Sequence, residues 1–230
     1  MIFEQAQRLT EVLLALAVFQ QALEHLIVPV RDRAWFVVQL ILALAVADGA
    51  APAFTQGALL VASAATIRHF RGPYNGGSDR MRLLVLGCLW LSHVASSPTW
   101  QHIFFGYLAV QVLLSYVVAG VVKLVNPDWR DGRALRDVFA FSVYPVSESL
   151  RRWAGRPSAL LVASWAIMLV EVAFPLALAH GMALKVALGV ALAFHIGNAS
   201  VFGLNRFVWA WIAAYPSLIW FQQELIGRMF

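Results

Sequence analysis

The sequence alternates long apolar segments with short polar connections, and this alternation constrains the fold more than any single motif. Hydrophobic residues make up 61% of the 230 residues, and charged residues make up only 13%. A soluble domain usually has about 45–50% apolar and about 25% charged residues. A single hydrophobic core could not bury the additional apolar residues of this chain. The pattern therefore predicts an all-α integral membrane protein with a surface that faces lipid.

The apolar segments predict a polytopic bundle of seven or eight transmembrane helices. A spanning helix needs about 20 residues, within a range of about 17–25, and several segments reach that length. We expect them to pack as a single integral membrane domain over residues 1–230. The segments cover residues 10–28, 34–50, 54–68, 82–97, 102–122, 158–180, 182–199 and 202–221.

Basic side chains concentrate in alternate loops, and the formal net charge is +5. On a soluble protein this charge would indicate binding to nucleic acid. Here it indicates how the protein is oriented in a membrane with anionic lipids, with the basic loops in the cytoplasm. We therefore expect lipid as a partner and no nucleic acid. The longest polar stretch, 124–157, mixes apolar and basic residues. Its part from Ala134 to Trp153 is expected to lie flat on the membrane as an interfacial helix.

Ionisable side chains inside apolar segments are candidate functional groups. A charge in lipid is energetically unfavourable, so such residues are rare and most of them serve a function. Three separate stretches are expected to bring such groups to a similar depth, at the face with the basic loops. Glu171 is expected to lie further in, roughly 20 Å from the start of its segment. The three stretches contribute Asn75 with Asp79, Lys123 with Asp128, and His195 with Asn198, which are three positions apart and so share one helix side.

Each of these groups also has a purely structural interpretation. A lysine at a helix end often extends towards lipid headgroups, and a buried histidine often bonds a backbone carbonyl of a neighbouring helix. The residues from Asn75 to Asp79 also form an ordinary turn sequence. The six histidines lack the close spacing of metal ligands, so we predict no metal site. The sequence also contains no phosphate-binding glycine motif and no serine nucleophile motif.

Two stretches resemble a known family. Residues 119–124, Ala-Gly-Val-Val-Lys-Leu, are followed by Asp128-Trp129 and Gly132. This stretch resembles the A-G-x-x-K-L…D-W-x-x-G sequence of the vitamin K-dependent γ-carboxylase and of the bacterial family that shares its horizontally transferred transmembrane (HTTM) domain. The second stretch begins with His195-x-x-Asn198 and continues to Phe202-Gly203. It is similar to the H-x-x-N-x-x-x-F stretch of that domain, and the likeness covers roughly residues 55–222.

The resemblance implies a multi-pass protein of the bacterial cytoplasmic membrane that uses a quinol, such as a naphthoquinol, as a lipid-soluble cofactor. In the carboxylase, the lysine that matches Lys123 is taken as the base that deprotonates reduced vitamin K. A lysine amine acts in this way only where burial or nearby cations make its ammonium form less stable. Lys123 and His195 are therefore the expected catalytic residues. The expected substrate- or cofactor-binding residues are Asn75, Ser78, Asp79, Asp128, Trp129, Glu171 and Asn198.

The sequence also departs from the carboxylase. A third stretch, from Tyr74 to Ser78, falls where the carboxylase has aromatic-Asn-Asn-His-Ser, and Gly77 stands in place of the histidine. We also expect no counterpart of the carboxylase's large peptide-binding domain. Two hypotheses follow, an enzyme that uses a quinol-like cofactor or a non-catalytic membrane subunit that binds lipid or quinone and holds a partner protein. A transporter is less favoured, because the sequence shows no inverted repeat.

Overall fold

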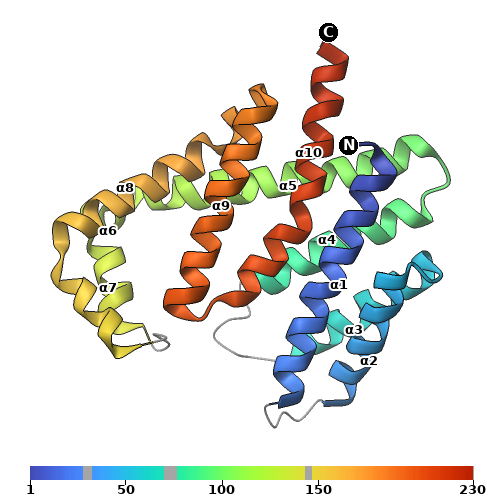
Figure 1. Ribbon diagram of the computed structural model, residues 1–230, viewed down its shortest axis with the longest axis horizontal. Helices are drawn as coiled ribbons and strands as arrows, with labels where there is room; N and C mark the ends of the chain where they lie inside the picture. The colour runs from blue at the N-terminus through green and yellow to red at the C-terminus, as the bar shows by residue number, and fades with distance from the viewer. Residues whose placement is uncertain (28–32, 70–76, 143–146, 230) are drawn as a thin grey trace. The chain divides into compact units, whose positions relative to one another are not determined.

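The computed structural model describes residues 1–27, 33–69, 77–142 and 147–229, and all regular structure in these residues is helical (Figure 1). The all-α prediction is therefore confirmed for this part of the chain. The elements are α1 (Phe3–Ile27), α2 (Arg33–Asp48), α3 (Pro52–His69), α4 (Gly77–Val94), α5 (Pro98–Val125), α6 (Pro127–Arg130), α7 (Arg133–Phe141), the 3-10 helix η1 (Glu148–Gly155), α8 (Pro157–Ala173), the 3-10 helix η2 (Phe174–Ala179), α9 (Gly181–Phe202) and α10 (Asn205–Met229).

Each predicted apolar segment overlaps a helix, because an apolar run bounded by proline, glycine or charged residues indicates where a helix lies. The segment 158–180 covers both α8 and η2, and α1 and α10 extend beyond their predicted segments. Within the described ranges, four helical stretches are long and apolar enough to cross a membrane. That all of the segments cross the membrane stays a prediction. The four stretches are Phe3–Ile27, Pro98–Val125, Pro157–Ala179 and Gly181–Phe202.

The chain divides into two compact units. Unit 1 comprises Met1–Val110 and Arg206–Phe230, and unit 2 comprises Gln111–Asn205. The first half of α5 thus belongs to unit 1, and its second half belongs to unit 2.

In unit 1, polar side chains of α1 join the neighbouring helices. The carboxylate of Glu11, which is 4% exposed, accepts a hydrogen bond from Gln56 of α3 at 3.0 Å and is paired with His93 of α4. Arg8 donates to Glu11 and to the carbonyl of Val46, near the end of α2, at 2.9 Å. Charges and amides buried in this way need partners, so these contacts determine how α1 to α4 pack.

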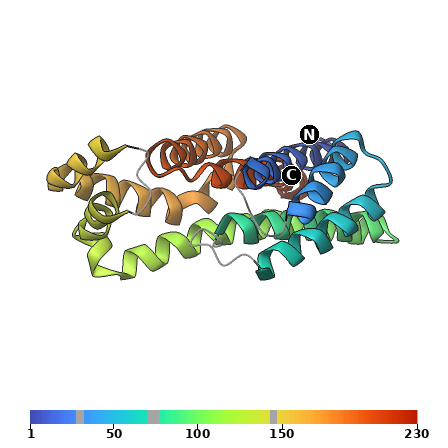
Figure 2. The same cartoon turned by 90° about the horizontal axis from the view of Figure 1, so that it is seen from below.

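In unit 2, α8 runs antiparallel beside the second half of α5 and beside α6 (Figures 1 and 2). The hydroxyl of Ser164 donates a hydrogen bond to the carbonyl of Trp129, and the indole of Trp165 donates one to the carbonyl of Arg130 at 3.0 Å. Further along both helices, Lys123 meets Glu171. The register of α8 against α5 and α6 therefore determines which polar groups meet.

Two glycines allow this close approach. A Cβ atom added at Gly120 would lie 2.8 Å from the backbone nitrogen of Val172 on α8. Gly132 has a φ of +77° and faces the backbone of Leu161, where an added Cβ would lie 2.9 Å from the Cα atom. Any larger residue would push α8 away at either position. Both glycines belong to the stretch on which the family resemblance rests. Close packing against α8 explains why glycine stands at these two positions.

Candidate functional site

A partly buried ion pair in unit 2 joins Lys123 of α5 to Glu171 of α8. The Nζ atom of Lys123 donates to both carboxylate oxygens, at 2.8 Å and 2.7 Å. The two side chains are 19% and 7% exposed, so water screens the pair weakly. The ring of Trp129 lies under the amine, 5.3 Å from its centre, and adds a cation–π contact.

The predicted difference in depth between these two residues is wrong, because an ion pair places them at one level. The expectation counted depth from the ends of the apolar segments, which puts Lys123 at the rim of the membrane. In the structure, α5 continues to Val125, and α6 then continues beside α8 after a break at Asn126. Packing against α8 therefore continues beyond Lys123.

A second polar pair lies on the same face of α5. The hydroxyl of Tyr116 lies 3.1 Å from Nε2 of His195 on α9, and the imidazole is 5% exposed. The Tyr116 ring also stacks on Phe174, with centroids 4.2 Å apart. Tyr116 precedes Lys123 by seven residues, two helical turns or about 10 Å along the axis. Residues seven apart share a helix face, so α5 presents both polar pairs on one side.

Tyr116 did not emerge from the sequence as a candidate residue. The spacing of seven from Lys123 was a signal that could have identified it, because the two positions share one face of a helix. The partner of the hydroxyl on α9 was not visible in the same way, because it depends on how two distant segments pack.

An apolar cavity of about 260 Å³ lies between α7, η1, α8 and α9. The amide of Asn198 is on its wall, among rings and aliphatic side chains such as Phe139 and Phe194. Ile167 also lines the cavity and stands one turn before Glu171 on α8, and Phe194 directly precedes His195. The cavity therefore borders the helix segments that carry both polar pairs. Its lining suits an apolar ligand with one hydrogen-bonding group.

Asp128 has local partners in the structure, and its expected role in binding a substrate or cofactor stays a prediction. It lies in the single turn of α6, where the side chain of Asn126 accepts a hydrogen bond from its backbone nitrogen at 2.9 Å. Its carboxylate pairs with Arg133 at 2.6 Å, and both side chains are about half exposed. This ion pair stabilises the turn between α6 and α7, which is a structural role for Asp128.

Ser78 and Asp79 lie in unit 1, in the first turn of α4, and both are buried. Gln21 of α1 donates to the Asp79 carboxylate at 3.1 Å, and the guanidinium of Arg82 lies 3.7 Å from it. Asn75 lies outside the described residues. That these residues join Lys123 in one site stays a prediction.

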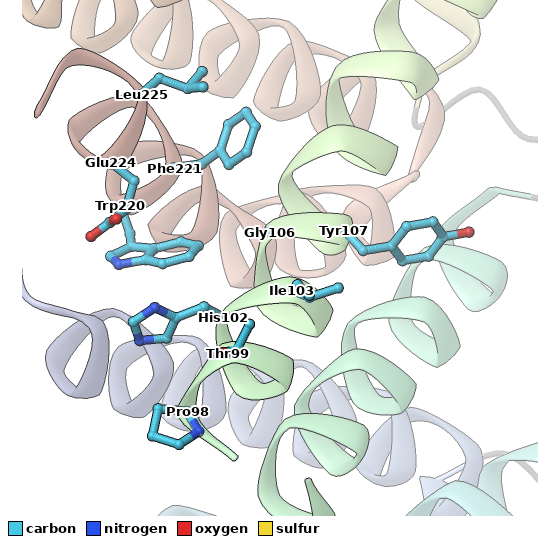
Figure 3. A pocket seen from close by; sticks show the side chains of 10 residues that line it. All are labelled: Pro98, Thr99, His102, Ile103, Gly106, Tyr107, Trp220, Phe221, Glu224 and Leu225. Carbon is cyan, nitrogen blue, oxygen red and sulfur yellow. The ribbon is translucent and has the colours of Figure 1, made fainter. Parts of the chain in front are cut away.

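Unit 1 contains a larger cavity of about 740 Å³, which sequence analysis did not predict (Figure 3). The first turns of α5 and the last turns of α10 form its walls, with Gly106 facing the rings of Trp220 and Phe221. The rings of His102 and Trp220 meet edge to face, with centroids 5.4 Å apart. Aromatic residues are expected near the ends of membrane helices in any case, so the positions of these rings in the sequence did not indicate a cavity.

The described residues contain no group of three or more His, Cys, Asp or Glu side chains placed to hold a metal ion. Long apolar helices carry an ion pair between two of them. These features define the class of protein, a helical membrane protein with a partly buried lysine–glutamate ion pair. Comparison with protein families matches residues 90–224 to the HTTM domain. This is more than half of the chain, which therefore belongs to the HTTM family, as the sequence resemblance predicted. Comparisons with curated proteins and with solved structures gave no match.

The matched region contains both polar pairs of unit 2 and begins after Ser78 and Asp79. The family assignment therefore covers the Lys123 and His195 stretches. It does not include the stretch from Tyr74 to Ser78, whose resemblance was the least close.

Proposed function

We propose that this protein is a membrane enzyme that removes a proton from a lipid-soluble quinol, with Lys123 and Glu171 acting together as the acid–base group. The observation that carries the proposal is the pair itself, in which one amine donates to both carboxylate oxygens with little exposure to water. Ionisable groups paired inside membrane helices are commonly used for proton transfer.

The pairing explains how a lysine that already holds a proton can act as a base. Moving one proton within the pair converts ammonium and carboxylate into amine and carboxylic acid, and the total charge does not change. An apolar setting reduces the advantage that the charged form has in water. The amine of Lys123 then accepts the proton of the quinol hydroxyl. The product is a quinolate beside an ammonium ion, with Glu171 protonated.

The cavity that Asn198 lines supports the choice of substrate class. Its walls are mainly apolar, which suits the ring and chain of a quinol, and the amide can hydrogen bond with an oxygen of the ring. The Tyr116–His195 pair brings a hydroxyl of α5 and an imidazole of α9 together on the side of α5 that carries Lys123. In this proposal, the second pair orients the substrate oxygen.

The test uses purified protein in lipid nanodiscs and a reduced naphthoquinone, with dissolved dioxygen as the oxidant. Quinol becomes quinone as dioxygen becomes hydrogen peroxide, and deprotonation of the quinol accelerates the transfer of electrons. We expect Lys123→Met to abolish the protein-dependent rate. Lys185→Met, at an exposed position of α9, is the control and should retain the rate. Equal rates for the two variants would remove Lys123 from the mechanism.

A second candidate function is a non-catalytic membrane subunit that binds lipid or quinone and holds a partner protein. Exposed side chains on α7 and η1 favour this alternative, since Phe141 is 75% and Trp153 is 43% exposed. A stoichiometric partner that is retained on purification, and whose activity needs this protein but not Lys123, would support it. The enzyme proposal predicts protein-dependent oxidation of the quinol without any partner.

A further inference from the structure

Helix α7 has two apolar faces and one charged face. Leu135 is 8% exposed, and it lines the cavity of unit 2 together with Phe139, one turn further on. Val138 and Phe141, three positions apart, are 39% and 75% exposed. Arg136 is exposed on the remaining side, and Asp137, also exposed, lies at the border between that side and Phe141. A helix with one packed face, one open apolar face and one charged face suits a boundary between hydrocarbon and water.

The residues around α7 extend this arrangement. Trp153 of η1 is 43% exposed, and the guanidinium of Arg156 lies 4.7 Å from the centre of its ring. Arg130, Arg152 and Arg156 form no ion pair with any described residue, whereas Arg133 and Arg151 do. A tryptophan and unpaired arginines at one end of a spanning helix are typical of contact with lipid headgroups.

We propose that α6, α7 and η1, called here the surface segment, lie on a phospholipid bilayer at the level of its headgroups. Val138 and Phe141 then enter the upper acyl layer, and the three unpaired arginines face lipid phosphates. A bilayer is a better occupant of this surface than a soluble protein, because η1 ends at Gly155 and α8, a candidate span, begins at Pro157. Figure 1 shows α6 and α7 gathered around the start of α8.

This placement determines the depth of the Lys123–Glu171 pair. The carbonyl of Arg130, in the surface segment, is bonded to Trp165, and Glu171 stands six residues beyond Trp165, or about 9 Å along the helix. Half of the hydrocarbon core of a bilayer is about 15 Å thick. The pair therefore lies within the hydrocarbon layer, where a substrate reaches it from the lipid phase.

Spin labels on single cysteines test both parts of the proposal. The sequence has one cysteine, Cys88, so Cys88→Ser gives the background for Phe141→Cys, Val138→Cys, Arg136→Cys and Val170→Cys. Arg136, exposed on the side of α7 away from Val138 and Phe141, is the matched control. Val170, 40% exposed beside Glu171, reports the level of the pair. Relaxation of each label by dioxygen, which concentrates in hydrocarbon, is compared with relaxation by a water-soluble nickel chelate. The protein is held in nanodiscs that contain phosphatidylglycerol.

We expect dioxygen to dominate at positions 138 and 141, the nickel chelate to dominate at position 136, and dioxygen to reach position 170 more than position 141. Equal access of the nickel chelate to positions 136 and 141 would overturn the surface placement and leave this face to a protein partner. A label at position 170 no deeper than that at position 141 would overturn the depth. If the Cys88→Ser background fails to fold, quenching of Phe141→Trp and Arg136→Trp by brominated phospholipid makes the same comparison.

Discussion

The amine of Lys123 contacts both carboxylate oxygens of Glu171, at 2.8 Å and 2.7 Å, between α5 and α8. Gly120, which stands almost one turn before Lys123, allows this contact, because the backbone of α8 occupies the space of a side chain. Close helix packing and the acid–base pair therefore depend on each other.

The ion pair should show strong coupling when both partners are replaced. Lys123→Met or Glu171→Gln alone leaves a mostly buried charge without its partner, so each should lower the free energy of unfolding by on the order of 3 kcal/mol. The double variant removes both charges and should lose less than either single variant. Unfolding titrations with sodium dodecyl sulfate in mixed micelles measure these differences. Additive losses would show that the two residues do not interact.

Gly120→Ala should destabilise unit 2 by about 1–3 kcal/mol, because the new methyl group would overlap the backbone at Val172. Gly189→Ala is the matched control, since a Cβ at that position of α9 meets nothing within 4 Å. Alanine is also a better helix former than glycine, so the control should be neutral or slightly stabilising. Thermal unfolding of both variants in detergent measures the effect. Equal melting temperatures would contradict the close approach of α8.

Tyr116→Phe should lower the rate of quinol oxidation more than it lowers stability. The variant retains the ring that stacks on Phe174 and loses the hydroxyl that meets His195, a contact worth about 1 kcal/mol of net stability. Rates and melting temperatures measured on one preparation separate the two effects. An unchanged rate would show that the hydroxyl has no part in orienting the substrate.

Asp79→Asn should destabilise unit 1, because Arg82 is buried and would lose its neighbouring carboxylate. The loss should be on the order of 3 kcal/mol, as for other buried pairs from which one charge is removed. Asp48→Asn, at an exposed position near the end of α2, is the control and should change stability little. Chemical unfolding of both variants provides the comparison. A stable Asp79→Asn protein would show that the carboxylate does not serve the packing of α1 against α4.

The sequence was sufficient to predict the helices and the family, because the length of an apolar run and the residues that end it are local properties. The expected segment 102–122 became part of α5, and the segment 182–199 became most of α9. Lys123 and His195 were recognisable from their motifs, and both belong to the region that matches the HTTM domain.

The partners of these residues could not be predicted, because they depend on how distant helices pack. Glu171 was expected further into the membrane than Lys123, and Tyr116 was not considered, yet each meets a predicted residue across a helix interface. Their contacts follow from the register of α8 against α5 and from the approach of α9, which no single segment encodes. Ser78 and Asp79 show the same limit, since the contacts of Asp79 are with Gln21 and Arg82 in unit 1.

The proton that leaves a quinol should appear on the Lys123–Glu171 pair, and infrared difference spectroscopy detects it directly. A reduced naphthoquinone is added to the protein in nanodiscs under nitrogen, in light water and in deuterium oxide. We expect a new protonated-carboxyl band that shifts in deuterium oxide and is absent from Glu171→Gln. A spectrum without this band, or the same band in Glu171→Gln, would contradict proton transfer to this pair.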